Sequence, residues 1–248
     1  MFLCVFLPAV LILYYLCPRK FRNLLLLAVS LLFYAWGEPI YVLLMLFTIA
    51  VDYASGLLID LFKRKEKQGL AKATLIATVV INLGLLGFFK YTDFVIDAFD
   101  SFTGMGLQLL EIALPIGISF YTFQTLSYTI DVYWGNVRVQ KNPIDFAMFV
   151  TFFPQLIAGP IVRYSDIENE LSVRQENPVQ FTHGVFRFLV GLGKKVILAD
   201  RIGALFETIS KYETGELTTV MAWTGALAFM FQIYFDFSGY SDMAIGMG

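Results

Sequence analysis

The amino-acid sequence predicts an all-α, polytopic transmembrane protein with broken or re-entrant helices. Of its 248 residues, 58% are hydrophobic and 15% are charged, whereas soluble domains carry about 25% charged residues. The mean hydropathy is +0.68, and a soluble protein of this size has too little interior to bury so much apolar surface. Several apolar runs are also long enough to cross a bilayer. Much of the surface is therefore expected to face lipid.

Charge and cysteine content argue against two other classes of protein. The formal net charge is -2, so the chain lacks the excess of basic residues that a nucleic-acid partner requires. The only cysteines, Cys4 and Cys17, lie inside or beside the first apolar run. A disulfide framework is therefore not expected.

Five apolar runs precede residue 143. Crossing the hydrocarbon takes about 20 residues, with roughly 17 to 25 usual. The first run lacks the basic region and the small-residue cleavage site of a signal peptide, so it predicts an uncleaved span. A polar, glycine-containing stretch at 91–111 is expected to separate the last two runs. The five predicted spans are residues 2–17, 21–36, 40–62, 71–89 and 112–133.

The distribution of lysine and arginine predicts the orientation of these spans. If every run crosses the membrane, the loops 18–22, 63–72 and 135–143 lie on one side and together hold ten basic residues. The loops on the opposite side hold only Lys90. Basic loops stay in the cytoplasm. We therefore predict a multi-pass protein with an extracytoplasmic N-terminus.

The pattern changes in residues 146–162, which read "FAMFVTFFPQLIAGPIV". The run is apolar enough to enter the membrane, but Pro154, Gly159 and Pro160 interrupt any helix. Irregular backbone at membrane depth is tolerated only where protein or a water-filled cavity covers it. The sequence therefore predicts a broken or re-entrant segment that faces the protein interior.

The remaining chain predicts three further segments. Residues 163–184 are polar and mixed in charge, as in an ordinary surface connection. Residues 185–203 are apolar but include Lys194 and Lys195, which favours an interfacial or tilted amphipathic helix. Residues 218–235 form the last clear apolar run.

Two carboxylates follow directly after this last run, in "FQIYFDFSGYSDMAIGMG" at 231–248. On a helix, Asp236 and Asp242 would lie on different faces, unlike the shared-proton pair of an aspartic protease. A structural or substrate-positioning role is therefore favoured over direct catalysis. Gly239 would allow a neighbouring backbone to come close. One helical stripe would hold Tyr234, Ser238, Ser241 and Asp242, and a second would hold Asp236 and Tyr240.

Other polar groups within the apolar runs have both a structural and a functional interpretation. Ionisable groups in a membrane are costly and indicate function by default, which applies to Asp52 and Asp131. Hydroxyl and amide side chains at 119–129 are typical of hydrogen bonds between helices. The only histidine, His183, is more simply explained as a residue near a helix start than as a base. No group of residues has the spacing of a metal site, a phosphate-binding loop or a nucleophile elbow.

Four stretches carry a resemblance to a known family. "FFPQLIAGPIVRYSDI" at 152–167 and "FQIYFDFSGYSDMAIGMG" at 231–248 resemble signature segments of the membrane-bound O-acyltransferases. "LPIGISFYTFQTLSYTIDVYWG" at 114–135 and "GLGKKVILADRI" at 191–202 are similar to the same family, in the same order. Within that family, the segments most resemble the bacterial, alginate O-acetylase-like branch.

This resemblance implies an O-acyltransferase of the bacterial inner membrane that acetylates an exopolysaccharide such as alginate. The implied partners are an acyl donor on the cytoplasmic side, either acyl-coenzyme A or an acyl carrier protein, and a polysaccharide or a periplasmic acetyltransferase. Membrane lipids are also implied partners, and neither a cofactor nor nucleic acid is expected.

The resemblance also implies that residues 1–248 form a single integral-membrane domain, the N-terminal part of such an enzyme. The family's catalytic histidine lies in a Trp-His motif expected after Gly248, so no catalytic residue is assigned in this chain. The 248 residues alone are expected to be inactive. What the resemblance suggests instead is that two segments wall a substrate passage. The expected lining residues are Pro154, Gln155, Gly159, Pro160, Arg163, Asp236, Ser238, Tyr240, Ser241 and Asp242.

Two alternatives stay open from the sequence. A secondary transporter also uses broken helices and carboxylates at the membrane midplane, although such proteins usually show an internal repeat, which this sequence lacks. The second alternative is a structural fragment without turnover of its own.

Overall fold

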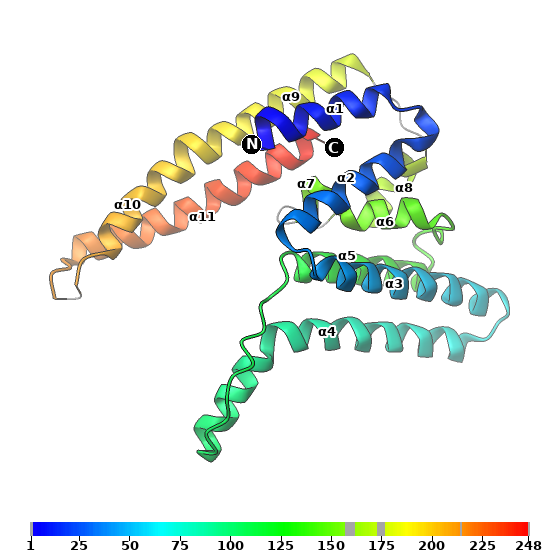
Figure 1. Ribbon diagram of the computed structural model, residues 1–248, viewed down its shortest axis with the longest axis horizontal. Coiled ribbons are helices and arrows are strands. Elements are labelled where there is room, and N and C mark those ends of the chain that lie inside the picture. Colours follow the sequence, from blue (N-terminus) through cyan, green and yellow to red (C-terminus); the bar gives the residue numbers. More distant parts are fainter. Residues whose placement is uncertain (1, 157–161, 173–176, 214, 248) are drawn as a thin grey trace. The chain divides into compact units, whose positions relative to one another are not determined.

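A computed structural model describes residues 2–156, 162–172, 177–213 and 215–247, and every regular element in these ranges is a helix (Figure 1). The residues fall into two compact units, which are described separately. Unit 1 comprises the described residues up to 172, and unit 2 comprises those from 177 onward. The predicted all-α class is confirmed.

Unit 1 contains four long helices and several short ones. The helices are η1 (Phe2–Phe6), α1 (Leu7–Leu16), η2 (Arg19–Phe21), α2 (Arg22–Gly37), α3 (Tyr41–Arg64), α4 (Gln68–Thr103), α5 (Ile118–Trp134), α6 (Pro143–Thr151), α7 (Phe153–Leu156) and α8 (Tyr164–Ser172). Unit 2 consists of α9 (Pro178–Gly193), η3 (Lys194–Ala199), α10 (Asp200–Ser210) and α11 (Thr219–Met247).

Among the described residues, three helices are long and apolar enough to cross a membrane: α3, α4 and α11. The first predicted span corresponds to the shorter apolar segment Phe2–Leu16. Helices α2 and α5 have 16 and 17 residues, which is at or just below the length that a span requires. The chain is therefore that of a membrane protein, and its sidedness stays a prediction.

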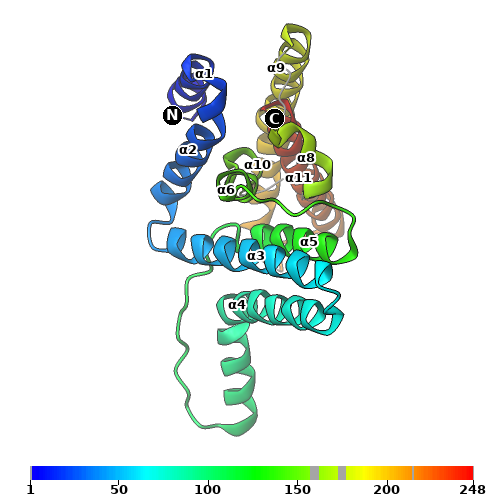
Figure 2. The same ribbon diagram turned by 90° about the vertical axis from the view of Figure 1, so that its right-hand side faces the viewer.

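Helices α3, α4 and α5 pack against one another in unit 1 (Figure 2), around a polar centre. Asp52 on α3 is fully buried. Its Oδ1 accepts a hydrogen bond from Thr129 Oγ1 of α5 at 2.9 Å, and its Oδ2 accepts one from Asn82 Nδ2 of α4 at 3.0 Å. Thr78 Oγ1 also donates to Ser55 Oγ at 2.7 Å. The prediction that polar groups of 119–129 join helices is thus confirmed for Thr129.

The prediction of a separating stretch at 91–111 is wrong for its first part, because α4 continues to Thr103. Residues 88–103 contain neither glycine nor proline, so no helix-breaking residue interrupts this stretch before Gly104. The carboxylates of this part then hold the following chain: Asp93 accepts from the Leu110 and Ile112 N–H groups, and Asp100 accepts from the Leu107 N–H group. The chain consequently returns alongside the end of α4 (Figure 2).

Helix α5 begins at Ile118 and not at residue 112, because Gly117 precedes it in a left-handed conformation with φ of +76°. A Cβ atom at this position would lie 2.6 Å from the carbonyl oxygen of Leu156. Gly117 therefore allows α5 to start directly against the backbone of α7.

The prediction of an ordinary surface connection at 163–184 is also wrong. Helix α8 lies within it, and Tyr164 and Leu171 are buried. The Tyr164 ring packs on Tyr128 and Phe149, and burial raises the pKa of Tyr164 to about 12. Residues 178–184 already belong to α9, because Asn177 accepts from the Val179 N–H and Pro178 suits a first helical position.

Unit 2 is an antiparallel helical hairpin. Helices α9, η3 and α10 run without a gap and lie along α11, joined by residues 211–218 (Figure 1). The predicted segments 185–203 and 218–235 are both helical, and both helices extend further: the first begins at Pro178, and the second continues through residues 236–242 to Met247.

Candidate functional site

The predicted break in residues 146–162 lies at Phe152, between α6 and α7. The backbone of Phe152 is extended, with ψ of 112°, so the Phe153 N–H cannot reach the Phe149 carbonyl as it would in a continuous helix. That N–H donates instead to Ser30 Oγ of α2, at 3.2 Å. A neighbouring helix therefore satisfies the donor that the break releases.

The carbonyl oxygen released by the same break accepts two side-chain amides. Gln155 Nε2 donates to the Phe149 oxygen at 2.7 Å, and Gln124 Nε2 of α5 donates to it at 3.1 Å. Because protein groups satisfy the interrupted backbone, the segment meets the condition for irregular structure at membrane depth. The prediction that this segment faces the protein interior is confirmed for the residues up to Leu156, which is buried together with Phe153 and Pro154.

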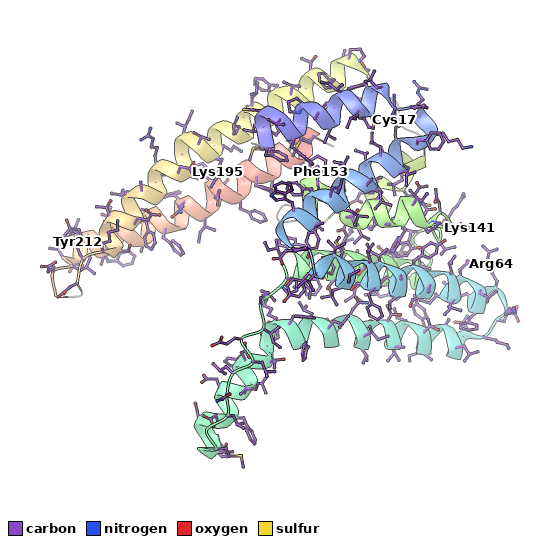
Figure 3. All side chains as sticks on the ribbon, in the orientation of Figure 1. Cys17, Arg64, Lys141, Phe153, Lys195 and Tyr212 are labelled. Carbon is purple, nitrogen blue, oxygen red and sulfur yellow. The ribbon has the colours of Figure 1, made fainter. Side chains whose placement is uncertain are left out.

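An aromatic cluster holds the break in place. The Phe153 ring lies 5.4 Å from that of Phe6 and 5.8 Å from that of Phe33, measured between centroids. Phe2 completes the cluster, at 6.1 Å from Phe153. Figure 3 labels Phe153 beside α2. Such ring pairs favour edge-on or tilted contacts at these separations, so η1 and α2 position α7.

In unit 2, both carboxylates of residues 231–248 bind cations of the neighbouring helix. Asp242 accepts from Lys194 Nζ at 2.6 Å and from Arg187 Nε at 3.1 Å. Asp236 accepts from Lys195 Nζ at 2.6 Å, and that ammonium group also contacts Asp200 at 3.2 Å. Each carboxylate thus has its own lysine, and the two do not form a shared-proton pair.

Ser238 belongs to the same network, because Lys194 Nζ donates to its hydroxyl at 3.1 Å. Lys194 therefore joins Ser238 and Asp242, which lie one helical turn apart on α11. Tyr240 and Ser241 are half-buried. Within the described part of unit 2, Lys194, Ser238, Asp242 and Arg187 form one continuous polar strip.

Glycines bring the two helices of the hairpin into backbone contact. A Cβ atom at Gly191 would lie 2.5 Å from the Gly239 oxygen, and one at Gly239 would lie 2.8 Å from the Gly191 oxygen. Gly184 and Gly246 approach each other in the same way. The prediction that Gly239 permits close approach of a backbone is confirmed. Small residues allow this approach in helix pairs within membranes.

The predicted lining residues separate into two groups. Pro154, Gln155 and Arg163 belong to unit 1, and Arg163 is exposed before α8. Gly159 and Pro160 lie outside the described residues. The group from Asp236 to Asp242 belongs to unit 2. The role of both groups in one passage therefore stays a prediction.

The cationic partners Arg187, Lys194 and Lys195 are functional candidates that the sequence interpretation did not connect to α11. The spacing of glycines along the sequence indicates that these cations lie beside α11. Residues 191 and 239, and residues 184 and 246, lie at nearly equal distances from the connection at 211–218. An antiparallel hairpin about that connection places the two glycine pairs together and brings the lysines beside the carboxylates.

The ion pairs of Asp242 and Asp236 predict that substituting these two carboxylates lowers the free energy of unfolding by unequal amounts. Asp242→Asn is expected to lower the free energy of unfolding by about 1–2 kcal/mol, because it weakens two charge-assisted hydrogen bonds of a side chain that is only 18% exposed. Asp236→Asn is the matched control, and its loss is expected to stay below about 1 kcal/mol because Asp236 is 49% exposed. Denaturation of the purified protein, followed by circular dichroism, measures both. Equal losses would contradict the difference in burial.

The described residues offer neither a metal site nor a histidine base within this strip. No group of three or more histidine, cysteine, aspartate or glutamate side chains is arranged to hold a metal ion in the described ranges. His183 is exposed near the start of α9. The strip can therefore bind and orient a polar group, and it lacks the parts for proton abstraction by imidazole.

Comparison with known proteins agrees with the sequence resemblance. The model of the membrane-bound O-acyltransferase family matches residues 136–248. The probable alginate O-acetylase AlgI of Pseudomonas aeruginosa is 45% identical over all of this chain, which covers 48% of that protein. The probable alginate O-acetylase AlgI of Azotobacter vinelandii is 43% identical over all of this chain, which covers 50% of that protein.

A relative with a different acceptor is also similar. The peptidoglycan O-acetyltransferase of Helicobacter pylori is 34% identical over all of this chain, which covers 52% of that protein. The chain thus spans about half the length of these relatives. The family model matches α6 to α11, including the broken segment and the polar strip, and the similarity to O-acetylases extends over the helices before it. Over residues 136–248 the chain is therefore similar to the membrane-bound O-acyltransferase family, and over its whole length it is similar to O-acetylases.

Proposed function

We propose that the whole protein is a membrane-bound O-acetyltransferase that transfers acetyl groups to hydroxyls of an exopolysaccharide such as alginate. The observation that carries the proposal is the 45% identity over the entire chain to a probable alginate O-acetylase. The similarity to a peptidoglycan O-acetyltransferase supports the general class of a polysaccharide acceptor.

The proposal includes a place and a direction for the reaction. The protein lies in the bacterial inner membrane with its N-terminus outside, as the basic loops 18–22, 63–72 and 135–143 favour. An acyl donor, either acyl-coenzyme A or an acyl carrier protein, delivers the acetyl group on the cytoplasmic side. The acceptor on the outer side is the polysaccharide or a periplasmic acetyltransferase.

Residues 1–248 contribute walls to this path in the proposal, as one integral-membrane domain. Two features support this role. The break at Phe152 releases backbone groups that side chains of the protein satisfy, and the strip around Lys194 places paired charges along α11. Broken helices and intramembrane charges are typical of substrate pathways. A hydroxyl acceptor must also lose a proton during acyl transfer, and we assign no residue of this chain to that step.

A chimera tests the proposal. Residues 1–248 replace the matching segment of the Pseudomonas aeruginosa relative, in a strain that makes alginate but lacks its own O-acetylase. We expect the chimera to restore most of the O-acetyl content of the polymer, measured by proton NMR. Residues 1–248 expressed alone are expected to restore none.

A second version of the chimera carries Asp242→Asn and Ser238→Ala, which remove the carboxylate and the hydroxyl that Lys194 binds on α11. Its O-acetyl content is expected to fall at least tenfold, because the strip would no longer orient a polar group. A chimera that inserts in the membrane at normal levels and leaves the polymer unacetylated would overturn the proposal.

A further inference from the structure

A cavity of about 340 Å³ opens at one end of α3 and α5 in unit 1. This volume lies within the range of about 300–1,000 Å³ that is usual for small-molecule pockets. Figure 3 labels Arg64 and Lys141 at this end of the unit. The cavity is lined by Asp60, Lys63, Arg64, Val132, Gly135, Val137, Arg138, Val139 and Lys141.

The charged groups of this cavity are mostly cationic. Four basic side chains line it, against the single carboxylate of Asp60. That carboxylate is already bound by Arg64 Nε, at 2.9 Å. Lys63 Nζ donates to the Tyr133 carbonyl at 2.6 Å and keeps two further N–H donors. A single carboxylate cannot neutralise four cations, so the cavity carries a net positive charge.

The ordinary role of cations at helix ends explains only half of this set. Lys63 and Arg64 lie in the last turn of α3, where cations complement the helix dipole. Arg138 and Lys141 lie instead on the loop between α5 and α6. Both are exposed, and neither side chain has an ion-pair partner among the residues that the structure describes.

Hydrogen bonds and a buried side chain fix the loop that carries these two residues, so the fold defines the shape of the cavity on this side. Tyr53 donates from its hydroxyl to the Lys141 carbonyl at 2.6 Å, and the buried Tyr128 hydroxyl accepts from the Gln140 N–H at 3.0 Å. Val137 is buried beneath the loop. Gly135, with φ of +86°, turns the chain out of α5. Two of the four cations are thus presented by an anchored backbone.

The position of the cavity points to the level of lipid headgroups. It lies at the end of α3, which is long and apolar enough to cross a membrane. Tyr133 and the 68% exposed Trp134 lie next to it, and such aromatic residues are enriched where the membrane meets water. Basic pockets between helices at this level bind phosphate-bearing headgroups.

We infer that this cavity is a phosphate-binding site formed by Lys63, Arg64, Arg138 and Lys141. Its ligand is a phosphate ester or diester, carried by an anionic lipid or by a soluble molecule at the membrane surface. Charge-assisted hydrogen bonds from lysine and guanidinium groups recognise such anions. This site involves different residues from the strip on α11.

Two binding measurements on the purified chain distinguish the sources. In the first, native mass spectrometry counts phosphatidylglycerol molecules retained from mixed micelles that also contain phosphatidylcholine. In the second, isothermal titration calorimetry follows inorganic pyrophosphate added to the chain in phosphatidylcholine nanodiscs. Retention of phosphatidylglycerol without pyrophosphate binding identifies a lipid headgroup, and pyrophosphate binding identifies a soluble phosphate ester. Either result supports the site.

The double variant Arg138→Gln and Lys141→Gln removes the two cations of the α5–α6 loop and should weaken binding at least tenfold in whichever measurement shows binding. The matched control is Lys65→Gln and Lys67→Gln, which removes the same charge from the neighbouring α3–α4 connection, outside the cavity. Its binding should stay within twofold. Equal weakening in both variants, or no binding of either probe by the unaltered chain, would overturn the inference.

Discussion

Gly191→Ala is expected to destabilise the hairpin of unit 2 by about 1–3 kcal/mol, the usual cost of overpacking. The added Cβ atom would lie 2.5 Å from the Gly239 oxygen and 2.8 Å from the Met243 nitrogen. Both are backbone atoms and cannot rotate away, so α9 must move from α11. That movement also lengthens the ion pairs of Asp242 with Lys194 and Arg187.

Gly193→Ala is the matched control for this substitution. The two glycines are two residues apart on the same helix, and a Cβ atom at Gly193 would meet nothing within 4 Å. Alanine there should stabilise the helix by about 0.5–1 kcal/mol, because glycine loses more backbone entropy on folding. Thermal unfolding of both variants in detergent, followed by circular dichroism, measures the difference. Destabilisation of the two variants to the same extent would contradict the glycine contact.

Asp52→Ala is expected to cost about 2–3 kcal/mol of stability in unit 1. The substitution leaves a cavity between α3, α4 and α5 and removes the acceptor of two interhelical hydrogen bonds, each worth about 0.6–2 kcal/mol in a membrane. Two effects reduce the sum. Asn82 Nδ2 keeps a bond to the Thr78 carbonyl at 3.1 Å, and the substitution removes a carboxylate that is costly to bury.

Asp60→Ala on the same helix serves as the control. Asp60 is partly exposed, and its ion pair among the described residues is with Arg64, four residues later. Such a pair contributes about 0.3–0.5 kcal/mol, so the loss should stay near that value. The midpoint of unfolding in denaturing detergent reports both variants. If Asp52→Ala proved as stable as the unaltered chain, the polar centre would not hold α3, α4 and α5 together.

The sequence predicted those parts of the fold that depend on composition and on local breakers. Hydrophobic content and run length give an all-α membrane protein, and Pro154 predicts the break that lies at Phe152. The hydroxyl-rich face of α5 predicts the contact of Thr129 with a neighbouring helix. Each of these features follows from the chemistry of a few neighbouring residues.

The features that sequence reasoning missed depend on contacts between distant segments. The polar residues 91–103 resemble a loop, but Asp93 and Asp100 lie on a continuing helix and bind the returning chain. Residues 163–184 look like surface, yet Tyr164 is buried against Tyr128. Polarity shows that a side chain needs a partner, and it does not show whether that partner is water or protein.

The candidate site also combines features that neighbouring residues predict with features that depend on contacts between distant segments. The unusual polarity of residues 231–248 is visible in the sequence, and so is the possibility of close backbone approach at Gly239. The identity of the partners, Arg187, Lys194 and Lys195, depends on the register between two helices about 45 residues apart along the chain. Pairing residues at equal distances from the connection at 211–218 would predict that register from the sequence.

The role of residues 231–248 depends on whether their carboxylates bind the cations of the neighbouring helix or face lipid. A double-mutant cycle between Lys194→Met and Asp242→Asn, measured as free energies of unfolding, tests this most directly. Arg187 is retained throughout, so the cycle isolates the 2.6 Å contact. We expect a coupling energy of about 1 kcal/mol or more, within the range for residues in contact. Effects that add to within about 0.3 kcal/mol would show that the two side chains do not interact.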